Sequence, residues 1–410
     1  MRTGGSMNRP VEFARGALAD LRVLELGTLL AGPFCGQILG DMGADVIKIE
    51  PPNQGDPMRV WGRHTGYDGP SLWWPVVSRN KKSITLDLRH AEGQAILKQL
   101  IAKADFLLEN FRPGTMEKWG LSYETLSAIN PRLIMIRVSG YGQTGPYAHR
   151  AGFGAIGEAM GGMRYVVGDP TTPPSRMGIS IGDSLAATFA CVGALSALHY
   201  REKTGRGQVV DSAIYEAVLN MMESLITEFD KTGFIRERTG AILPNIAPSN
   251  VYPTLDSLVL IAANQDTVFR RLCEAMGRPE LAQESAYVDH QSRGRHQSQL
   301  DDLISRWTAA RATQDVLELM DKHGVPAGLI YRAPDMLTDP QFAARQAIVT
   351  VKHPHYGDLK MQNVAPKLSE TPGAIRSVAP DLGQHNDEVY LDLLQIAPER
   401  YSALKARSVI

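Results

Sequence analysis

Short apolar runs alternate with helix-like segments through residues 1–215, and this alternation constrains the fold more than any other feature of the sequence. The apolar runs have the length of strands, and the segments between them repeat their apolar residues at helical spacing. Strands that are separated by helices pair in parallel and are joined by right-handed crossovers. The pattern therefore predicts an α/β domain in which helices cover a parallel sheet. The strands are expected at 23–26, 45–50, 84–88, 106–108, 133–138 and 209–211, and the helices at 33–42, 91–103, 184–202 and from 211 through Met222.

The character of the sequence changes near residue 225. An irregular stretch rich in glycine and proline leads into two apolar runs around a short turn, which predicts a β-hairpin. The elements expected here are strands 251–254 and 258–262, helices 265–276 and 299–322, and strand 327–331. We therefore divide the chain into the first part of a large domain (1–225), a smaller α+β domain (226–330) and a C-terminal segment that returns to the large domain (331–410).

Composition agrees with a two-domain globular protein. The 410 residues are too many for one small core, and 43% hydrophobic with 21% charged residues is ordinary. A formal net charge of -1 provides no global field to attract nucleic acid or a membrane surface, so neither partner is expected. The cysteines (Cys35, Cys191 and Cys273) stand in apolar helical contexts and are expected to be core thiols in a reducing cytosol.

The N-terminal sequence predicts a cytoplasmic protein. It carries no apolar stretch of the signal-peptide type, and no apolar run reaches the length of a membrane span. Residues before Leu21 are expected to form a loose extension, with Met7 as an alternative start.

The first strand-to-helix turn invites a dinucleotide-binding interpretation. Its glycines are Gly27, Gly32 and Gly36, which is not the spacing that lets a backbone approach a pyrophosphate. Glu50, at the end of the second strand, resembles the acid that binds ribose in NAD enzymes. A tight packing turn remains the favoured interpretation, with an NAD site as the alternative.

Basic residues gather around the first strands. A solvated protein face is one explanation for them. A local positive patch for a ligand with several phosphates is the other, because strand ends in an open parallel sheet border the ligand crevice. The residues concerned are Arg79, Lys81, Lys82, Arg89, Arg112 and Lys118.

Two loops and one acid are further candidates. Phe111 follows a strand and could stack on an adenine or fill the core, and loop 139–146 could approach a ligand or be a plain turn. Asp183 precedes an apolar helix, so an N-cap is the ordinary interpretation. A carboxylate at a helix N-terminus also stays ionised, as a nucleophile must.

No zinc-protease, Walker or nucleophile-elbow pattern is present, and no metal site is expected.

Several segments resemble the family III CoA-transferases, which include formyl-CoA transferase and carnitine CoA-transferase. The N-terminal segments are LRVLELGTLLAGPFCGQILGDMGADVIKIEPP, NKKSITLDLRHAEG, DFLLENFRPG and INPRLI. They are followed by SGYGQTGPY, GDSLAA and REKTGRGQVVD, and then by DPQFAAR, HPHYG and LGQHNDEV beyond the small domain. The resemblance covers nearly the whole chain in the expected order.

The resemblance implies a mechanism and a set of site residues. An aspartate of the family attacks the acyl-CoA thioester, giving a mixed anhydride and then an enzyme–CoA thioester, and Asp183 matches that nucleophile. It also implies a Rossmann-like large domain with a smaller α+β domain in an interlocked homodimer. No cofactor would be bound permanently, since coenzyme A thioesters and small carboxylic acids are the substrates. The implied CoA contacts fall on Ala31, Leu86, Asp87, Leu88, Arg89, Asn110, Phe111, Arg112 and Lys118.

Departures from the family pattern bear on the substrate. Leu30 and Pro51 replace a glutamine and an arginine of formyl-CoA transferase, and residues 241–250 replace its tetraglycine loop. These differences argue against formyl-CoA and oxalate, and we expect small acids, including dicarboxylates such as succinate, mesaconate or relatives of malate. Arg164 and Arg176 could bind a second carboxylate, with structural pairing as the alternative.

Three other functions remain open at this point. The fold also contains α-methylacyl-CoA racemases, but Phe153 stands where they carry a proton-transferring histidine. Gly154 follows where many relatives have an acid, so Glu158 becomes the candidate for an assisting carboxylate. An NAD-dependent oxidoreductase and a non-catalytic CoA-binding subunit are the remaining alternatives.

Overall fold

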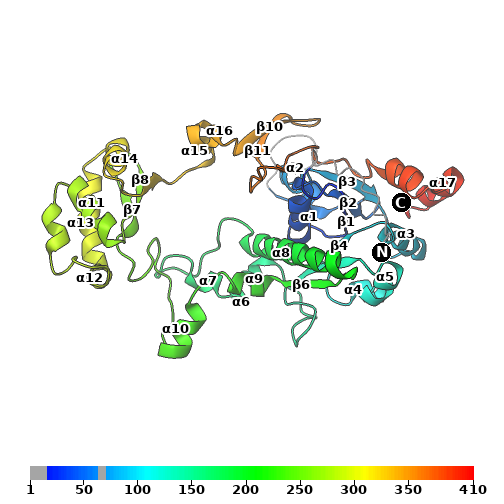
Figure 1. The fold of residues 1–410 in the computed structure, drawn as a ribbon, viewed down its shortest axis with the longest axis horizontal. Coiled ribbons are helices and arrows are strands. Elements are labelled where there is room, and N and C mark those ends of the chain that lie inside the picture. The colour runs from blue at the N-terminus through cyan, green and yellow to red at the C-terminus, as the bar shows by residue number, and fades with distance from the viewer. Residues whose placement is uncertain (1–15, 63–70) are drawn as a thin grey trace, which may run out of the picture. The chain divides into compact units, whose positions relative to one another are not determined.

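The computed structural model describes residues 16–62 and 71–410, so residues 1–15 of the expected N-terminal extension, with Met7, lie outside the described residues. The rest of that extension is not loose, because the Leu18 N–H donates to the Met42 carbonyl (3.0 Å). The chain forms two compact units (Figure 1). Of the described residues, the first unit contains 16–62, 71–163, 177–226 and 343–410, and the second contains 164–176 and 227–342.

A six-stranded parallel sheet in the order β3-β2-β1-β4-β5-β6 organises the first unit. This is the strand order of a Rossmann fold, so the predicted fold class is confirmed. The strands are β1 (Arg22–Glu25), β2 (Asp45–Glu50), β3 (Lys81–Thr85), β4 (Phe106–Glu109), β5 (Ile134–Ser139) and β6 (Val209–Ala213). The helices are α1 (Ala31–Asp41), α2 (Trp74–Val77), α3 (Ala91–Ile101), α4 (Thr115–Lys118), α5 (Tyr123–Ile129), α6 (Gly154–Met160), α8 (Ile181–Thr204), α9 (Ile214–Leu219) and α17 (Pro398–Ala406), with a π-helix over Glu388–Leu393.

Helices cover both faces of this sheet because successive strand residues point to opposite sides. Val23 packs with α1 and α8 on one face, whereas Leu24 packs with α3, α5 and α17 on the other. On the first face the thiols of Cys35 and Cys191 lie 3.3 Å apart between α1 and α8. All three cysteines are buried, as expected for core thiols.

A β-hairpin, β10 (Ile348–His353) with β11 (Gly357–Gln362), follows the second unit in the chain and belongs to the first. Beyond it, residues 377–409 run along β3, the edge strand of the parallel sheet. The Ser83 N–H donates to His385 Nδ1 (3.1 Å), and the Thr85 N–H donates to Asn386 Oδ1 (2.9 Å). Side chains thus supply acceptors that another strand would supply elsewhere in the sheet.

The second unit has its own core. Its three-stranded antiparallel sheet has the order β7-β8-β9, and the strands pack against α11, α13 and α14. Its elements are β7 (Ser249–Pro253), β8 (Leu258–Ala262), β9 (Ala327–Leu329), α11 (Asp266–Ala275), α12 (His290–Arg295), α13 (Gln297–Ala309), α14 (Thr313–Lys322) and α15 (Ala333–Thr338), with a 3-10 helix over Pro279–Gln283. Three further helices span the divisions between the units: α7 (Met163–Val166), α10 (Leu225–Thr232) and α16 (Pro340–Ala344).

Some predicted elements differ from the structure, and two of them show the physical reason. The helix expected over 299–322 is two helices, because Asp256 accepts the Thr313 N–H (2.8 Å) and starts α14 there. The strand expected at 84–88 is β3 over Lys81–Thr85. Its lysines could enter the strand because Glu25 and Asp45 neutralise them.

Candidate active site

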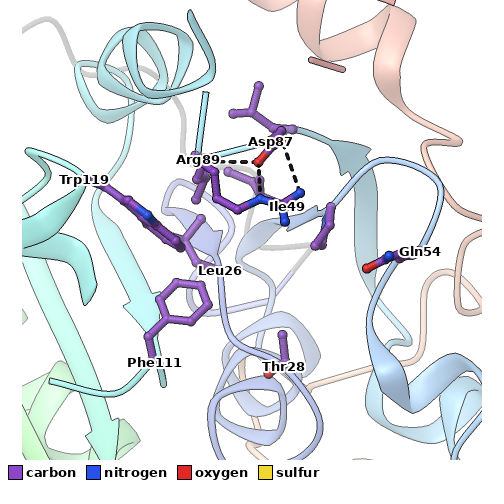
Figure 2. A pocket seen from close by; sticks show the side chains of 11 residues that line it. Leu26, Thr28, Ile49, Gln54, Asp87, Arg89, Phe111 and Trp119 are labelled. Carbon is purple, nitrogen blue, oxygen red and sulfur yellow. Dashed lines mark hydrogen bonds and ion pairs between the residues drawn. The ribbon is translucent and has the colours of Figure 1, made fainter. Parts of the chain in front are cut away.

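The carboxyl ends of β1, β2, β3 and β4 lie at one edge of the parallel sheet and surround a cavity of about 190 Å³. Ligands of open α/β sheets bind outside this edge, where the strand order reverses between β1 and β4. Figure 2 shows the aromatic rings of Phe111 and Trp119 on one side of the cavity and Gln54 on the other. The lining residues are Leu26, Thr28, Ile49, Pro51, Gln54, Leu86, Asp87, Leu88, Arg89, Phe111 and Trp119.

The aromatic wall is fixed from behind by a buried ion pair. Phe111 and Trp119 meet edge to face, with ring centroids 5.3 Å apart. The Phe111 N–H donates to Glu109 Oε2 (2.7 Å), and Arg137 Nε donates to Glu109 Oε1 (2.7 Å). Burial raises the pKa of Glu109, and Arg137 opposes that rise. Neutralisation by Arg137 allows a carboxylate to hold the wall from inside the protein.

The loop after β3 forms the polar rim. Leu86 and Leu88 point into the core, whereas Asp87 and Arg89 alternate with them toward the cavity mouth. Arg89 Nε donates to Asp87 Oδ1 (2.9 Å), and this bond lowers the pKa of Asp87 (Figure 2). The exposed Arg89 side chain is the cationic group of the lining residues.

The other predicted contact residues lie near the cavity without lining it. Ala31 is the first residue of α1 and is buried. Arg112 precedes α4, Lys118 is the last residue of α4, and both side chains are exposed. Asn110 uses both ends of its amide on Thr28: Oδ1 accepts the Thr28 N–H (2.8 Å), and Nδ2 donates to the Thr28 carbonyl (2.9 Å). Asn110 therefore shapes the turn between β1 and α1.

The predicted basic patch is wrong for two of its members. Arg79 is buried and binds Asp41 through two nitrogens, and Lys81 is buried and pairs with Glu25 at 2.8 Å. Lys82 is half-buried between Asp45 and Glu388. Charge alone could not separate these internal ion pairs from a ligand site, because burial is not visible in a local sequence pattern.

Glu50 does not act as the acid of a dinucleotide site. Its carboxylate is buried and binds Arg59 through both oxygens at 2.8 Å, and it also accepts the Ser83 hydroxyl (2.6 Å). Because both carboxylate oxygens bind groups inside the protein, Glu50 is not available to bind a ribose. The NAD interpretation of the first turn therefore loses its acidic residue.

Asp183 lies within the first turn of α8, three residues after the N-cap residue Ser180. The interpretation of Asp183 as the cap itself is therefore wrong, because the helix begins at Ile181. Helices in a parallel sheet of this type begin at the carboxyl edge of the strands, so Asp183 shares that edge with the cavity.

The Asp183 carboxylate lies against the start of α6. A Cβ built on Gly154 would be 2.3 Å from Asp183 Oδ2, so a side chain at residue 154 is incompatible with this orientation. Glu158 is buried one turn further along α6, with its Cγ 3.4 Å from a Cβ built on Gly182. Phe153 is the N-cap residue of α6 and is 68% exposed.

Sequence reasoning missed several lining residues. Leu26 directly follows β1 and Ile49 is the second-last residue of β2, which was a usable signal, since strand ends border the crevice. Trp119 follows a one-turn helix whose position depends on tertiary packing, so no local pattern indicated it.

Comparison with known proteins places this arrangement in a class. The chain belongs to CoA-transferase family III, whose model matches residues 18–386, and the resemblance found in the sequence is confirmed. It is an enzyme that transfers CoA between an acyl-CoA and a carboxylic acid. It is similar to succinyl-CoA–D-citramalate CoA-transferase of Chloroflexus aurantiacus, with 61% identity over 394 residues, 96% of this chain and 98% of the relative.

Two further relatives extend the comparison. The beta subunit of succinyl-CoA–L-malate CoA-transferase from C. aurantiacus is 43% identical over 96% of this chain and 98% of its own length. The crystal structure of a CAIB/BAIF family protein from Brucella suis superposes with a TM-score of 0.82 and 33% identity, over 92% of this chain and 100% of that one.

Proposed function

We propose that this enzyme moves CoA from a succinyl-CoA-type donor to a small dicarboxylic acid related to citramalate, through covalent intermediates on Asp183. The placement of the Asp183 carboxylate in the first turn of α8, at the sheet edge that carries the cavity, is the observation that supports this most directly. The 61% identity to a succinyl-CoA–D-citramalate CoA-transferase supports the choice of donor and acceptor.

The proposed reaction has four displacements. The Asp183 carboxylate attacks the donor thioester carbonyl, the carbon–sulfur bond breaks, and a mixed anhydride and CoA thiolate form. The thiolate then attacks the Asp183 carbonyl and releases the donor acid, leaving an enzyme–CoA thioester. The acceptor carboxylate displaces the thiolate again and forms a second anhydride. The thiolate finally attacks the acceptor carbonyl, which releases the new acyl-CoA and regenerates Asp183.

The cavity supplies the proposed CoA site. A planar adenine fits beside the aromatic wall of Phe111 and Trp119, since stacking on an aromatic ring favours any base. The loop from Leu86 to Arg89 would contact the base and ribose, with Asn110 and Ala31 shaping the neighbouring turn. Exposed Arg89, Arg112 and Lys118 are the candidate partners of the phosphates. No permanently bound cofactor is required.

Trapping the intermediate tests the proposal. The enzyme is incubated with succinyl-CoA and other acyl-CoA donors, treated with hydroxylamine or borohydride, and digested for peptide mapping. Modification is expected at Asp183, and Asp183→Asn should lose the adduct together with about 10³-fold or more of the activity. Absence of modification at Asp183 with every donor under turnover conditions would contradict the mechanism.

Acceptor competition tests the substrate. With succinyl-CoA as donor, D-citramalate and L-malate are compared with mesaconate and glutarate by their kcat/KM values. A preference for hydroxylated dicarboxylates is expected. Exchange of the α-proton of an acyl-CoA without any acceptor would instead support a racemase, for which exposed Phe153 offers no proton carrier.

We also propose a cytoplasmic homodimer with interlocked chains. Apolar side chains form a stripe along the uncovered face of α8: Phe189, Val192 and Leu195, with Val192 57% exposed. A patch of this kind on one chain usually marks an interface. The C. aurantiacus malate enzyme is named with alpha and beta subunits, 42% and 43% identical to this chain, which supports pairing of two such chains.

A further inference from the structure

The turn between β1 and α1 is held by side chains from three other parts of the first unit. Lys48, in β2, donates to the Gly27 carbonyl (2.8 Å). Asn110, after β4, binds both backbone groups of Thr28. Asp56, in the loop after β2, accepts the Leu29 N–H at 3.0 Å. From Gly27 to Leu29 these backbone contacts are made by side chains that are distant in sequence, so this part of the turn depends on other elements for its shape.

The backbone conformation of Leu29 explains why the turn needs these side-chain bonds. Its φ is +62°, in the left-handed region that a leucine adopts only at a cost. The N–H bond to Asp56 favours this conformation over the alternatives. The side chain of the preceding residue, Thr28, lines the cavity, and Ala31 begins the helix two residues later.

Asp56 lies on the loop that carries the opposite wall of the cavity. Gln54, on the same loop, lines the cavity across from the aromatic wall (Figure 2), and Pro51 of this loop also lines the cavity. The Asp56 N–H donates to Glu50 Oε2 (2.8 Å), and Asp56 Oδ1 accepts the Met58 N–H (2.8 Å). One buried carboxylate therefore joins loop 51–56 to the β1–α1 turn.

The carboxylate is kept charged inside the protein by Lys48. Their charged atoms are 2.7 Å apart, and both side chains are 1% exposed. Burial opposes ionisation of Asp56, but Lys48 and backbone N–H donors outweigh it and lower the pKa of Asp56. Burial likewise opposes the charge of Lys48, and Asp56, Glu25 and Glu50 outweigh it and raise the pKa of Lys48.

We propose that Asp56 is a positioning residue for CoA transfer. Through its bond to the Leu29 N–H, it fixes loop 51–56 relative to the β1–α1 turn, and both segments contribute residues to the CoA site. This rests on the proposed assignment of the cavity to CoA. Asp56 itself does not line the cavity, so it acts through the backbone of the turn. Its loss lowers affinity for the CoA part of the donor and leaves recognition of the acceptor acid unchanged.

Binding of free CoA, measured by calorimetry on the full-length enzyme, tests this proposal. Asp56→Asn keeps the shape of the side chain but removes its charge, and about a tenfold rise in the CoA Kd is expected, or about 1.4 kcal/mol. The KM for the acyl-CoA rises in parallel, while the KM for the acceptor stays within about twofold.

Two further variants separate positioning from general destabilisation. Leu29→Val leaves the ion pairs intact but places a β-branched residue in the left-handed region, so the CoA Kd should rise here as well. Asp41→Asn is the matched control, because Asp41 is a buried carboxylate paired with buried Arg79 (2.6 Å) at the other end of α1. It should lower the melting temperature and leave the CoA Kd unchanged.

An unchanged CoA Kd in Asp56→Asn or Leu29→Val would overturn the proposal. So would an equal loss of affinity in Asp41→Asn, since stability alone would then explain the effect. Failure of the wild-type enzyme to bind free CoA would remove the assignment of the cavity and this role together. A wild-type enzyme that binds CoA but forms no adduct contradicts only the Asp183 mechanism.

Discussion

Gly154 and Asp183 share one small volume where α6 and α8 begin. Sequence reasoning treated Gly154 as the position of a missing acid. The structure shows that the space for a side chain at residue 154 is taken by the Asp183 carboxylate, 2.3 Å from where a Cβ would stand. The glycine is thus a steric condition for the orientation of the proposed nucleophile.

Gly154→Ala should impair chemistry without impairing CoA binding. The added methyl group forces Asp183 to another rotamer, so we expect at least a tenfold fall in kcat, or about 1.4 kcal/mol, with an unchanged CoA Kd. Gly178→Ala is the matched control, because a Cβ there meets nothing within 4 Å. Adduct formation is followed by rapid quench. Wild-type rates in Gly154→Ala would show that Asp183 reacts from a different orientation.

The residues of the site were predictable to different degrees. Leu86–Arg89 and Phe111 follow strands and line the cavity, where the rule for strand ends and the family resemblance both placed them. Asp56 was not predicted, because its role depends on a bond to Leu29 across 27 residues of sequence. Arg79 and Lys81 were wrongly predicted as ligand-binding cations, since their acidic partners Asp41 and Glu25 lie on other elements.

At the scale of elements, β3 shows how a sheet edge is closed without another strand. His385 and Asn386 bind successive outward N–H groups of β3, and Tyr390 donates its hydroxyl to the Thr85 carbonyl (2.5 Å). The next backbone N–H, that of Asp87, donates to the Val409 carbonyl at 2.8 Å. The C-terminal segment therefore stabilises the strand that leads into the loop of the proposed CoA site.

The bond from Ser83 to His385 predicts a pH-dependent stability. His385 must be neutral to accept at Nδ1, and burial lowers its pKa, with Glu388, Lys82 and Asp45 as the nearby charges. The unfolded chain then takes up the proton first, so this contribution is complete above about pH 6.5 and declines as pH falls toward the lowered folded value.

Urea unfolding of three proteins between pH 7.5 and 5 measures the effect. His385→Ala should lose about 1–3 kcal/mol at pH 7.5, because the buried Ser83 N–H is left without its acceptor. His385→Asn retains an acceptor near the Nδ1 position and should lose less. Its stability should also fall less between pH 7 and 5 than that of the wild type. Parallel pH profiles for all three proteins would exclude His385 as the titrating group.

The bounds of a helix or strand could be predicted from sequence where the local residue pattern determines them, and not where a distant contact does. Strand 45–50 was predicted residue for residue, as expected for a run with three β-branched residues between turn signals. The start of α8 was misplaced by three residues, because Ser180 and Asp183 are both ordinary capping residues and only the structure distinguishes them. The break before α14 depends on Asp256, 57 residues away.

For the whole molecule, α8 combines two surfaces. Small residues such as Ala187, Ala190 and Ala194 are buried against the parallel sheet, whereas the opposite face carries the stripe of Phe189, Val192 and Leu195. Among residues 16–62 and 71–410, α8 is the helix with the length and apolar composition of a membrane span. Its buried alanine face identifies it as a core helix, and the stripe is the surface that the proposed homodimer would bury.

A charge in the stripe tests the proposed homodimer. We expect the wild-type enzyme to show twice the 44.9 kDa mass of one chain by light scattering. Val192→Glu should shift the protein toward the single-chain mass at micromolar concentration, because burying an unpaired carboxylate costs several kcal/mol. Lys103→Glu, exposed at the end of α3 on the other face of the sheet, is the control and should leave the mass unchanged. An unaltered mass in Val192→Glu would place the interface elsewhere.

The closure of β3 by the C-terminal segment also has a consequence for synthesis on the ribosome. Ser83 emerges 302 residues before His385, the residue that covers its N–H. At roughly 5–20 residues per second, a nascent chain carries this open strand edge for about 15–60 s. Strand edges of this kind recruit other chains. Production of the enzyme should therefore depend on chaperones that shield the β3 edge during translation, and slower translation should increase that dependence.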